Sequence, residues 1–390
     1  MKNSRIFLTW QPVLTDHQAF TYQALAQQAA VPVVAYVTAA EDAERKTQGW
    51  ARTQVNSVEQ RPIPGKGFLS YCYRQLCEYR TDIHVFASPF QQPRLILCML
   101  LAAWLGVEFY LISEPFSPNA DGYLSESSAW RGKLKAMLRP WVYRCYARLF
   151  GARLAGIFAI SGLAIAQYEK AGVPSGKLFP FGYFIPAERP SPLRSALPVA
   201  AADACLKIVF VGNLIRRKGL DLLQEAVHGL SGKGYKISVD VFGPGDPSSL
   251  PADDPGIRYR GLIPFGQAQQ VIARYDLLVL PSRYDGWGVV VNEALCAGVP
   301  VVCSDATGAG GVAAAFGSGL LFSVGDAASL SAVLARLVDD PGLLNAMRTA
   351  TAPTAQALQP EVAASYMLDV IRAPAALKST IRAPWCPQSA

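Results

Sequence analysis

The sequence lacks most of the patterns that mark metal-binding, disulfide-rich or membrane-spanning proteins. Only three of its 390 residues are histidine, and its eight cysteines are scattered without a C-x-x-C pair. Cysteine and histidine metal sites need such clusters, so no metal site is expected. The longest apolar run, LILCMLLAAWL (Leu95–Leu105), is too short to cross a bilayer. We therefore expect no transmembrane helix, and we expect the cysteines to be reduced core residues of a cytosolic protein.

Several short motifs are also absent. The chain has no P-loop ending in G-K-[ST] and no G-x-G-x-x-G fingerprint, which argues against a P-loop nucleotidase and against a dehydrogenase. It has no D-x-D pair of the kind that holds a divalent ion on a donor diphosphate. The N-terminus, MKNSRIFLTWQPV, has one short apolar run followed by polar residues. That pattern predicts a first strand and not a signal peptide.

Composition predicts two globular domains, since 51% of the residues are hydrophobic and 17% are charged in a chain of this length. The net charge of +7 comes from the first half, where residues 1–190 hold 20 Lys and Arg against 13 Asp and Glu. Seven of these basic residues, and no acidic ones, fall in Trp130–Leu154. A basic, apolar helix suits an anionic membrane surface or substrate, and the alternative is a solvated surface helix. Nucleic acid is not expected, because no zinc-finger or RRM pattern accompanies the run.

Short apolar runs alternate with helical periods along the whole chain, which predicts parallel sheets covered by helices. The predicted strands are RIFLTW, PVVAYV, IHVFAS, EFYLIS and GIFAIS in the first half and LKIVFVGNL, KISVDVFGPG, IRYRGLI, LLVLPS, VPVVCS and GLLFSV in the second. A proline-rich segment, Ile185–Ala204, separates the halves. We predict an N-terminal domain over residues 1–186, a linker over 187–204, a C-terminal domain over 205–360, and a tail over 361–390 that packs back on the N-terminal domain.

The first motif with chemical content is VFVGNLIRRKGLDLLQEA (Val209–Ala226). A strand runs into a glycine turn, then into the basic cluster Arg216, Arg217 and Lys218, and then into a helix from about Leu220. Cations beside a helix N-terminus favour an anion, so this turn is a candidate diphosphate site. The alternative is a solvated basic loop.

The second motif, PSRYDGWGVVVNEALCAGVPVV (Pro281–Val302), places two carboxylates around a predicted helix start. The helix is expected from about Gly288 to Gly298, so Asp285 lies in the loop before it and Glu293 lies one to two turns inside. Carboxylates accept hydrogen bonds from vicinal hydroxyls of a ribose or a hexose. The alternative is that Asp285 caps the helix and Glu293 forms a surface ion pair.

Together the two motifs resemble those of retaining glycosyltransferases of family 4, which have the GT-B fold. FVGNLIRRKG is followed about sixty residues later by DLLVLPSRYDGWGVVVNEALCAGVPVV, which is similar to the family's pattern of glutamate, seven residues, glutamate. The segment FAISGLAIAQYEKAGVPSGKLFPFGYF (Phe158–Phe184) resembles the family's last N-domain helix and the entry to its linker. The resemblance is specific from about Ile157 to Val324 and implies two Rossmann-like domains facing across a cleft.

The resemblance also implies roles for individual residues. Glu293 would bind the ribose of the nucleotide, Asp285 the hydroxyls of the donor sugar, and Lys218 the diphosphate. The predicted donor-binding residues are Gly212, Asn213, Arg216, Arg217, Lys218, Asp285, Gly286, Trp287, Gly288, Val289 and Glu293. The amides of Gly286, Trp287 and Gly288 would hold the sugar and its phosphates.

The chain departs from the family pattern at three places. Asn213 stands where the family has an arginine, so Arg216 or Arg217 would supply the charge. Asp285 is one methylene shorter than the usual glutamate, which bears on the choice of donor sugar. The glycine-rich first loop is also missing, and the acceptor side is predicted from His17 and from Glu114 at the end of EFYLIS. The alternatives are a turn residue for His17 and a capping or solvated carboxylate for Glu114.

We therefore predict a metal-independent, retaining hexosyltransferase that uses a nucleoside diphosphate sugar. Lys218, Asp285 and Glu114 are its predicted catalytic residues, and its acceptor is a saccharide or lipid-linked saccharide of polysaccharide or glycolipid synthesis. The protein would be cytoplasmic, or peripheral on the cytosolic face of the membrane. A nucleotide-sugar hydrolase or epimerase of the same fold, and a non-catalytic nucleotide-binding module, remain alternatives.

Overall fold

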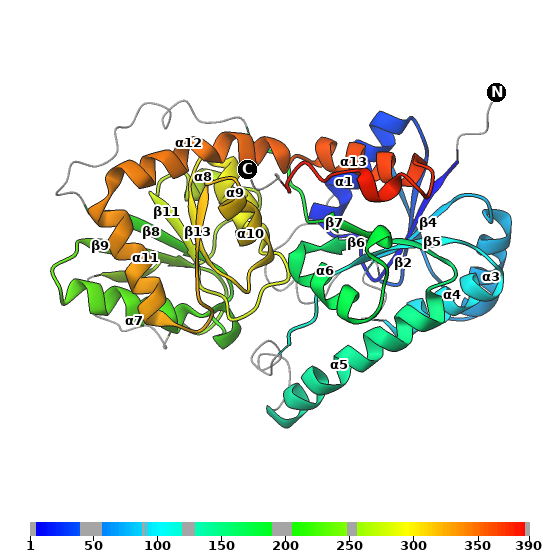
Figure 1. The fold of residues 1–390 in the computed structure, drawn as a ribbon, viewed down its shortest axis with the longest axis horizontal. Coiled ribbons are helices and arrows are strands. Elements are labelled where there is room, and N and C mark those ends of the chain that lie inside the picture. Colours follow the sequence, from blue (N-terminus) through cyan, green and yellow to red (C-terminus); the bar gives the residue numbers. More distant parts are fainter. Residues whose placement is uncertain are drawn as a thin grey trace. The chain divides into compact units, whose positions relative to one another are not determined.

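The computed structural model describes residues 5–39, 57–87, 90, 92–118, 129–188, 205–247 and 256–386. The chain divides into two units, each built around a parallel sheet covered by helices (Figure 1). The first unit comprises residues 1–116, 138–185 and 359–384, and the second comprises residues 117–137, 186–358 and 385–390. The α/β architecture with two parallel sheets confirms the fold class predicted from the alternation of strands and helices.

The sheet of the first unit has the strand order β3-β2-β1-β4-β5-β6-β7, and all of its neighbouring strands are parallel. Its strands are β1 (Phe7–Gln11), β2 (Val33–Val37), β3 (Val58–Pro62), β4 (Ile83–Ala87), β5 (Phe109–Ser113), β6 (Leu154–Ile160) and β7 (Leu178–Phe181). The two edge strands, β3 and β7, were not among the predicted strands. β3 reads VEQRP and is mostly polar, and β7 is a four-residue strand that contains Pro180. Edge strands are often short, polar or proline-containing, which weakens their sequence signal.

Helices cover both faces of this sheet (Figure 1). One face carries α1 (Asp16–Ala29) and α13 (Pro360–Arg372), and the other carries α3 (Phe68–Glu78), α4 (Pro93–Trp104), α6 (Ser161–Lys170) and the part of α5 (Ala129–Phe150) that follows Met137. α13 packs along α1, where the Gln28 amide donates to the Glu361 carbonyl at 2.9 Å and accepts from the Ser365 hydroxyl at 2.9 Å. The C-terminal helix therefore belongs to the first unit.

Alternation along β1 sends its side chains to the two helical layers. Leu8 and Trp10 enter the core beneath α3, α4, α5 and α6, whereas Phe7 packs against Tyr22 of α1. Trp10 stacks on Tyr36 with ring centroids 4.2 Å apart. Aromatic stacking of this kind adds to the stabilisation that comes from burying the rings, so large rings contribute much of the stability of this core.

The sheet of the second unit has the order β10-β9-β8-β11-β12-β13, again all parallel. Its strands are β8 (Leu206–Val211), β9 (Ile237–Phe242), β10 (Ile257–Tyr259), β11 (Leu277–Leu280), β12 (Val301–Ser304) and β13 (Gly319–Phe322). Its helices are α7 (Leu220–Ser231), α8 (Ala268–Ile272), α9 (Val289–Cys296), α10 (Gly308–Ala315), α11 (Ala327–Asp339) and α12 (Pro341–Ala357). The order reverses between β8 and β11, and ligands of open parallel sheets bind at such a switch point.

The cysteines are less buried than the sequence predicted. Only Cys72, Cys98 and Cys303 are buried, and four of the other cysteines are exposed, so the prediction of eight core cysteines is wrong. None of the described helices combines the length and the apolar character needed to cross a bilayer. Most of the predicted linker, residues 189–204, lies outside the described residues.

Candidate active site

The turn after β8 is shaped by close backbone approach. Gly212 follows the strand and donates its N–H to the Phe242 carbonyl of β9 at 2.9 Å. On the β9 side, a Cβ on Gly243 would lie 1.9 Å from the Gly212 carbonyl oxygen, and its φ is +143°. Only glycine fits there, because any side chain would overlap the neighbouring backbone. The two glycines thus bring the ends of β8 and β9 together.

The basic cluster is a short 3₁₀ turn, Arg216–Lys218, and Gly219 joins it to α7. Gly219 has φ +71°, and a Cβ there would lie 1.9 Å from the Pro281 carbonyl oxygen. Pro281 directly follows β11. Glycine at this position therefore lets the basic turn lie directly against the end of β11, so two loops far apart in the sequence become one surface.

Arg283 fastens these loops to one another. Its guanidinium donates two hydrogen bonds of 2.7 Å to the two carboxylate oxygens of Asp221 and one of 2.8 Å to the Arg216 carbonyl. Its own N–H donates to the Arg217 carbonyl at 2.8 Å. Burial acts to raise the pKa of Asp221, but the Arg283 guanidinium outweighs it and the pKa is lowered. Neither Arg283 nor Asp221 was among the predicted site residues.

Lys218 and Asp285 meet at the centre of this surface. The Lys218 Nζ lies 2.6 Å from the Asp285 Oδ2, and both side chains are largely buried. The contact joins the two sequence motifs through their predicted diphosphate lysine and predicted sugar carboxylate. Charged partners at this distance form a strong hydrogen bond, so each orients the other.

The backbone of Asp285 is held from the opposite side. Its N–H donates to the Ala306 carbonyl at 3.0 Å, and its own carbonyl accepts from the Gly308 N–H at 3.1 Å. Gly288, with φ +88°, is the N-cap of α9, and α10 begins at Gly308. Asp285 is therefore not the cap of α9. It lies beside the N-termini of two helices, whose dipoles favour an anion.

Glu293 lies in the second turn of α9, as predicted. Burial, and after it the nearby charge of Glu188, raises the pKa of its carboxyl to about 7. Glu188 is held by α8, since its N–H donates to the Gln269 amide oxygen at 2.9 Å. A raised pKa is the opposite of what an ion-pairing cation would cause, which argues against the surface ion pair considered for Glu293.

The remaining donor-side residues have distinct environments. The guanidinium of Arg217 donates to the Tyr284 carbonyl at 3.2 Å, and its Nε is buried without a partner among the described residues. Arg216 is exposed, and Asn213 is half-buried beside it in the turn. Trp287 is 2% exposed, and its indole N–H donates to the Asn292 side chain at 2.9 Å. Its ring thus belongs to the core.

In the first unit the structure brings His17 and Glu114 to the same tyrosine. The Tyr183 hydroxyl donates to the Glu114 Oε1. The His17 ring lies against the Tyr183 ring, with centroids 4.1 Å apart, and its Nε2 is 3.0 Å from the Thr15 hydroxyl. His17 is the second residue of α1 and is buried, so its interpretation as a turn residue in a polar loop is wrong. Tyr183 was not predicted.

The same edge of the first sheet carries unsatisfied polar atoms. Ser161, at the end of β6, has φ +72°, a conformation that a non-glycine residue adopts only when its surroundings enforce it. The Ser161 hydroxyl and the Gln11 amide nitrogen are buried without a hydrogen-bond partner among the described residues. Buried polar groups are nearly always paired, so such atoms at a strand end suit a polar ligand.

Metal-ligating side chains do not cluster in the described part of the chain. No group of three or more His, Cys, Asp or Glu side chains is placed to hold an ion there.

Residues 201–353 match the family Glycosyl transferases group 1. This match contains the basic turn, Asp285 and Glu293. The chain carries a group 1 glycosyltransferase domain. The chain is similar to a putative teichuronic acid biosynthesis glycosyltransferase of Bacillus subtilis, with 37% identity over 28% of this chain and 26% of the relative. It is also similar to a D-inositol 3-phosphate glycosyltransferase of Catenulispora acidiphila, with 31% identity over 36% of this chain and 38% of the relative.

The alignments span about a quarter to two-fifths of the length of these relatives. Solved structures are similar over nearly the whole chain. HepE of Anabaena in complex with UDP has a TM-score of 0.69 at 14% identity and covers 94% of this chain and 99% of that one. WaaG, a glycosyltransferase involved in lipopolysaccharide biosynthesis, has a TM-score of 0.59 at 16% identity and covers 94% of this chain and 100% of that one. The solved structures that are similar to this chain thus have the GT-B fold.

Proposed function

We propose that the protein transfers a sugar from a nucleoside diphosphate sugar to a hydroxyl of a saccharide or lipid-linked saccharide. The observation that carries this proposal is the convergence of Lys218, Asp285 and two helix N-termini at the switch point of the glycosyltransferase domain. Such a surface offers cationic and amide donors to a diphosphate and a carboxylate to sugar hydroxyls. The UDP complex of the structurally similar HepE protein supports a nucleotide ligand.

The chemistry that this surface suits is departure of the nucleoside diphosphate. As the glycosidic bond to phosphate breaks, negative charge grows on the diphosphate while the sugar becomes oxocarbenium-like. Lys218 and the first amides of α9 would stabilise that charge, and fixed donors of this kind are effective because they need no reorganisation. We propose that no metal ion takes part and that the anomeric configuration is retained.

Asn213 stands where the family has an arginine, and we propose that Arg216 supplies the missing positive charge. Arg217 is bound to the Tyr284 carbonyl from within the loop, whereas Arg216 is exposed at the surface of the turn. Asp285 would have two roles. It holds the Lys218 ammonium in place, and its second oxygen would accept from a hydroxyl of the donor sugar.

Glu293 is proposed to bind the ribose hydroxyls, and the cluster of Glu114, Tyr183 and His17 is proposed to bind the acceptor. Tyr183 would orient the Glu114 carboxylate, which could then accept a hydrogen bond from the attacking hydroxyl. The basic helix α5 is proposed to hold the protein on an anionic membrane surface at the cytosolic face, where a lipid-linked acceptor is found.

The proposal is tested by a panel of nucleoside diphosphate sugars. Thermal shift identifies the nucleotide that binds, and product analysis with saccharide and lipid-linked acceptors then measures transfer and anomeric configuration. Release of free sugar without an acceptor would indicate a hydrolase. Nucleotide binding without turnover of any donor would indicate a binding module, and inversion of the anomeric centre would contradict the proposed stereochemistry.

A further inference from the structure

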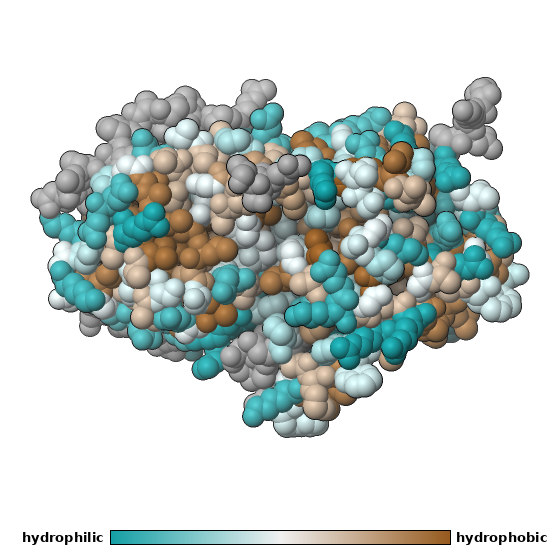
Figure 2. All heavy atoms as spheres, in the orientation of Figure 1, coloured by the Kyte–Doolittle hydropathy of each residue, from teal (hydrophilic) through white to brown (hydrophobic). Residues whose placement is uncertain are grey.

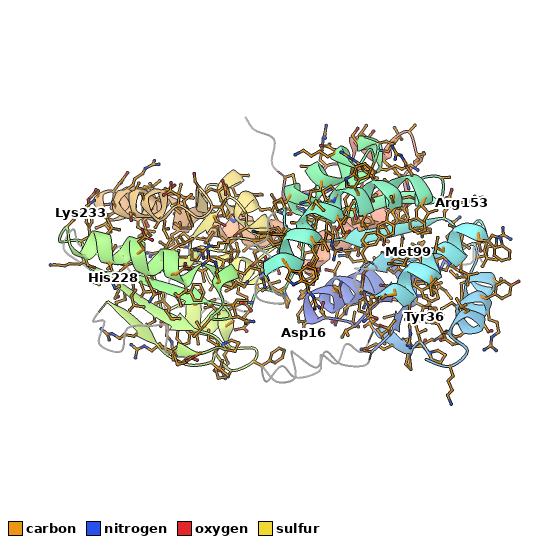
Figure 3. All side chains as sticks on the ribbon, turned by 90° about the horizontal axis from the view of Figure 1, so that it is seen from below. Asp16, Tyr36, Met99, Arg153, His228 and Lys233 are labelled. Atoms are coloured by element: carbon orange, nitrogen blue, oxygen red, sulfur yellow. The ribbon has the colours of Figure 1, made fainter. Side chains whose placement is uncertain are left out.

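The apolar run Leu95–Leu105, which is too short to cross a bilayer, forms most of α4. Half of that helix faces the core, where Leu95, Cys98 and Met99 are fully buried. Met99 is labelled in Figure 3. Its other side is also apolar, because Leu97, Leu100 and Trp104 follow one another at helical spacing and are exposed. Trp104 is 76% exposed, which is unusual for so large an apolar ring.

The neighbouring helices of the same layer repeat this arrangement. α3 exposes Leu69 and Tyr73, one turn apart. α5 exposes Trp130, Leu134, Met137, Leu138 and Trp141, which form one stripe along the helix. Of the sixteen large apolar side chains that the described residues expose, eleven lie on α3, α4 and α5. We call the outer surface of these three helices the docking face.

The stripe on α5 points away from the protein. Tyr143 and Phe150 of this helix are buried in the core, and Tyr143 lies about 200° around the helix from Trp141. The helix therefore has one apolar side that its own protein covers and a second apolar side that it leaves exposed. Trp130 and Trp141 are 63% and 62% exposed.

The charges of these three helices and their ends are almost all positive. Residues 68–80, 93–106 and 129–153 contain ten Lys and Arg residues and one acidic residue, Glu78. The guanidinium of Arg131 lies 5.4 Å from the Trp130 ring centre, and that of Arg144 lies 5.7 Å from the Trp141 ring centre. Figure 2 shows hydrophilic and hydrophobic side chains next to one another along α5 and a hydrophobic patch near α4. Apolar stripes flanked by cations are the pattern of helices that lie in a lipid interface.

We infer that the outer sides of α3, α4 and α5 dock on an anionic lipid bilayer, with Leu97, Leu100 and Trp104 of α4 inserted together with the exposed apolar side chains of α5. The inference rests on the proposed function in that it extends the membrane contact proposed for α5 alone. A second copy of the chain fits this face poorly, because a symmetric contact would oppose ten positive charges to ten others. A nucleic acid would leave the leucines and methionine without an apolar partner. A bilayer with anionic headgroups satisfies both the charge and the apolar stripes.

The inference is tested by sedimentation with vesicles of phosphatidylcholine, with and without phosphatidylglycerol. The variant L97S/L100S/W104S changes only exposed side chains and is expected to weaken partition onto anionic vesicles by about tenfold or more. The matched control L262S/F265S/L321S removes exposed apolar side chains of the second unit and is expected to bind like wild type. Neutralising Arg131, Lys133, Lys135 and Arg139 with glutamine should reduce binding most at low salt.

A second measurement locates Trp104 itself. In the variant W130F/W141F, brominated lipids should quench the fluorescence of Trp104. This quenching should be missing in W104F/W130F/W141F, which lacks that tryptophan. If L97S/L100S/W104S bound vesicles as well as the wild-type protein, or if Trp104 were not quenched, the inference would be overturned and only the α5 contact would remain. A dimer in solution that the α4 variant dissociates would also overturn it. Donor binding and transfer to a water-soluble acceptor should be unchanged in these variants, so their loss would concern the proposed function and not the docking face.

Discussion

The Lys218 ammonium and the Asp285 carboxylate lie 2.6 Å apart at the carboxyl end of the second sheet. They are 67 residues apart in the chain and come from the turn after β8 and the loop after β11. In the absence of a donor, each is the other's counter-ion. An ammonium has three donors, so Lys218 can keep Asp285 and still bind a phosphate oxygen. The pair thus presents a positioned cation and a positioned acceptor on one surface.

Lys218 should contribute to turnover more than any other lysine of this unit. Replacing it with alanine removes the cation nearest the proposed diphosphate and leaves the Asp285 carboxylate unpaired, so we expect kcat/KM for the donor to fall by about 10²- to 10³-fold. The matched control is K233A, an exposed lysine just after α7 that is labelled in Figure 3. Near-normal turnover of a folded K218A enzyme would rule out the assigned role.

Glu293 should make donor affinity depend on pH. Its pKa is raised to about 7, so the carboxyl is protonated below that pH and accepts hydrogen bonds from two hydroxyls best above it. We expect the affinity for the nucleoside diphosphate, measured by calorimetry, to rise between about pH 6 and pH 8. In E293Q the affinity should be lower by about tenfold and should lose this dependence. If the affinity of E293Q depended on pH as that of the wild-type protein does, the pH dependence would belong to another group.

The same shift predicts an effect on stability. Because the folded-state pKa of Glu293 lies above its ordinary value of 4.5, the protonated carboxyl contributes stability that is present at lower pH. This contribution is lost as the pH rises toward and through 7. Relative to E293Q, the free energy of unfolding of the wild-type protein should therefore decrease over that interval. Urea unfolding of both proteins at several pH values measures the difference.

The Arg283–Asp221 pair should stabilise the site by holding the turn after β8 and the loop after β11 together. Arg283 makes three side-chain hydrogen bonds, two of them to one carboxylate, and a lysine cannot reproduce that fork. We expect R283K and R283A to lower the free energy of unfolding by about 1–3 kcal/mol and to weaken donor binding. The control is R258A, an exposed arginine on β10. Unchanged stability and donor binding in R283A would contradict the proposed fastening of the two loops.

Tyr183 should affect the acceptor without affecting the donor. Y183F removes the hydroxyl that donates to Glu114 and keeps the ring against His17. We expect the KM for the acceptor to rise by about tenfold, since one hydrogen bond to a charged group is lost. The affinity for the nucleoside diphosphate should not change. Y235F, which removes an exposed hydroxyl bonded to Asp339 in the other unit, serves as the control. Equal effects on donor and acceptor would place Tyr183 outside the acceptor site.

The donor motifs were found in the sequence because each is local. A strand, a glycine turn and a helix start follow one another within about twenty residues, so the positions of Lys218, Asp285 and Glu293 on their elements could be predicted. Their partners could not. Arg283 and Asp221 are 62 residues apart, and Tyr183 and Glu114 are 69 apart. Arg283 and Tyr183 both lie in segments that resemble the family, but nothing in those segments marks either one as different from an ordinary surface or core residue.

The sequence by itself determined the alternation of strands and helices, the two basic and acidic motifs, and the positive charge of the first half. These follow from local periodicity, turn residues and composition. Only the tertiary structure decided that Lys218 pairs with Asp285, that burial and then Glu188 raise the pKa of Glu293, and that half of an apolar run faces outward on α4. The physical reason is that burial and contact depend on which side of each element packs, and that side is chosen by neighbours distant in the chain.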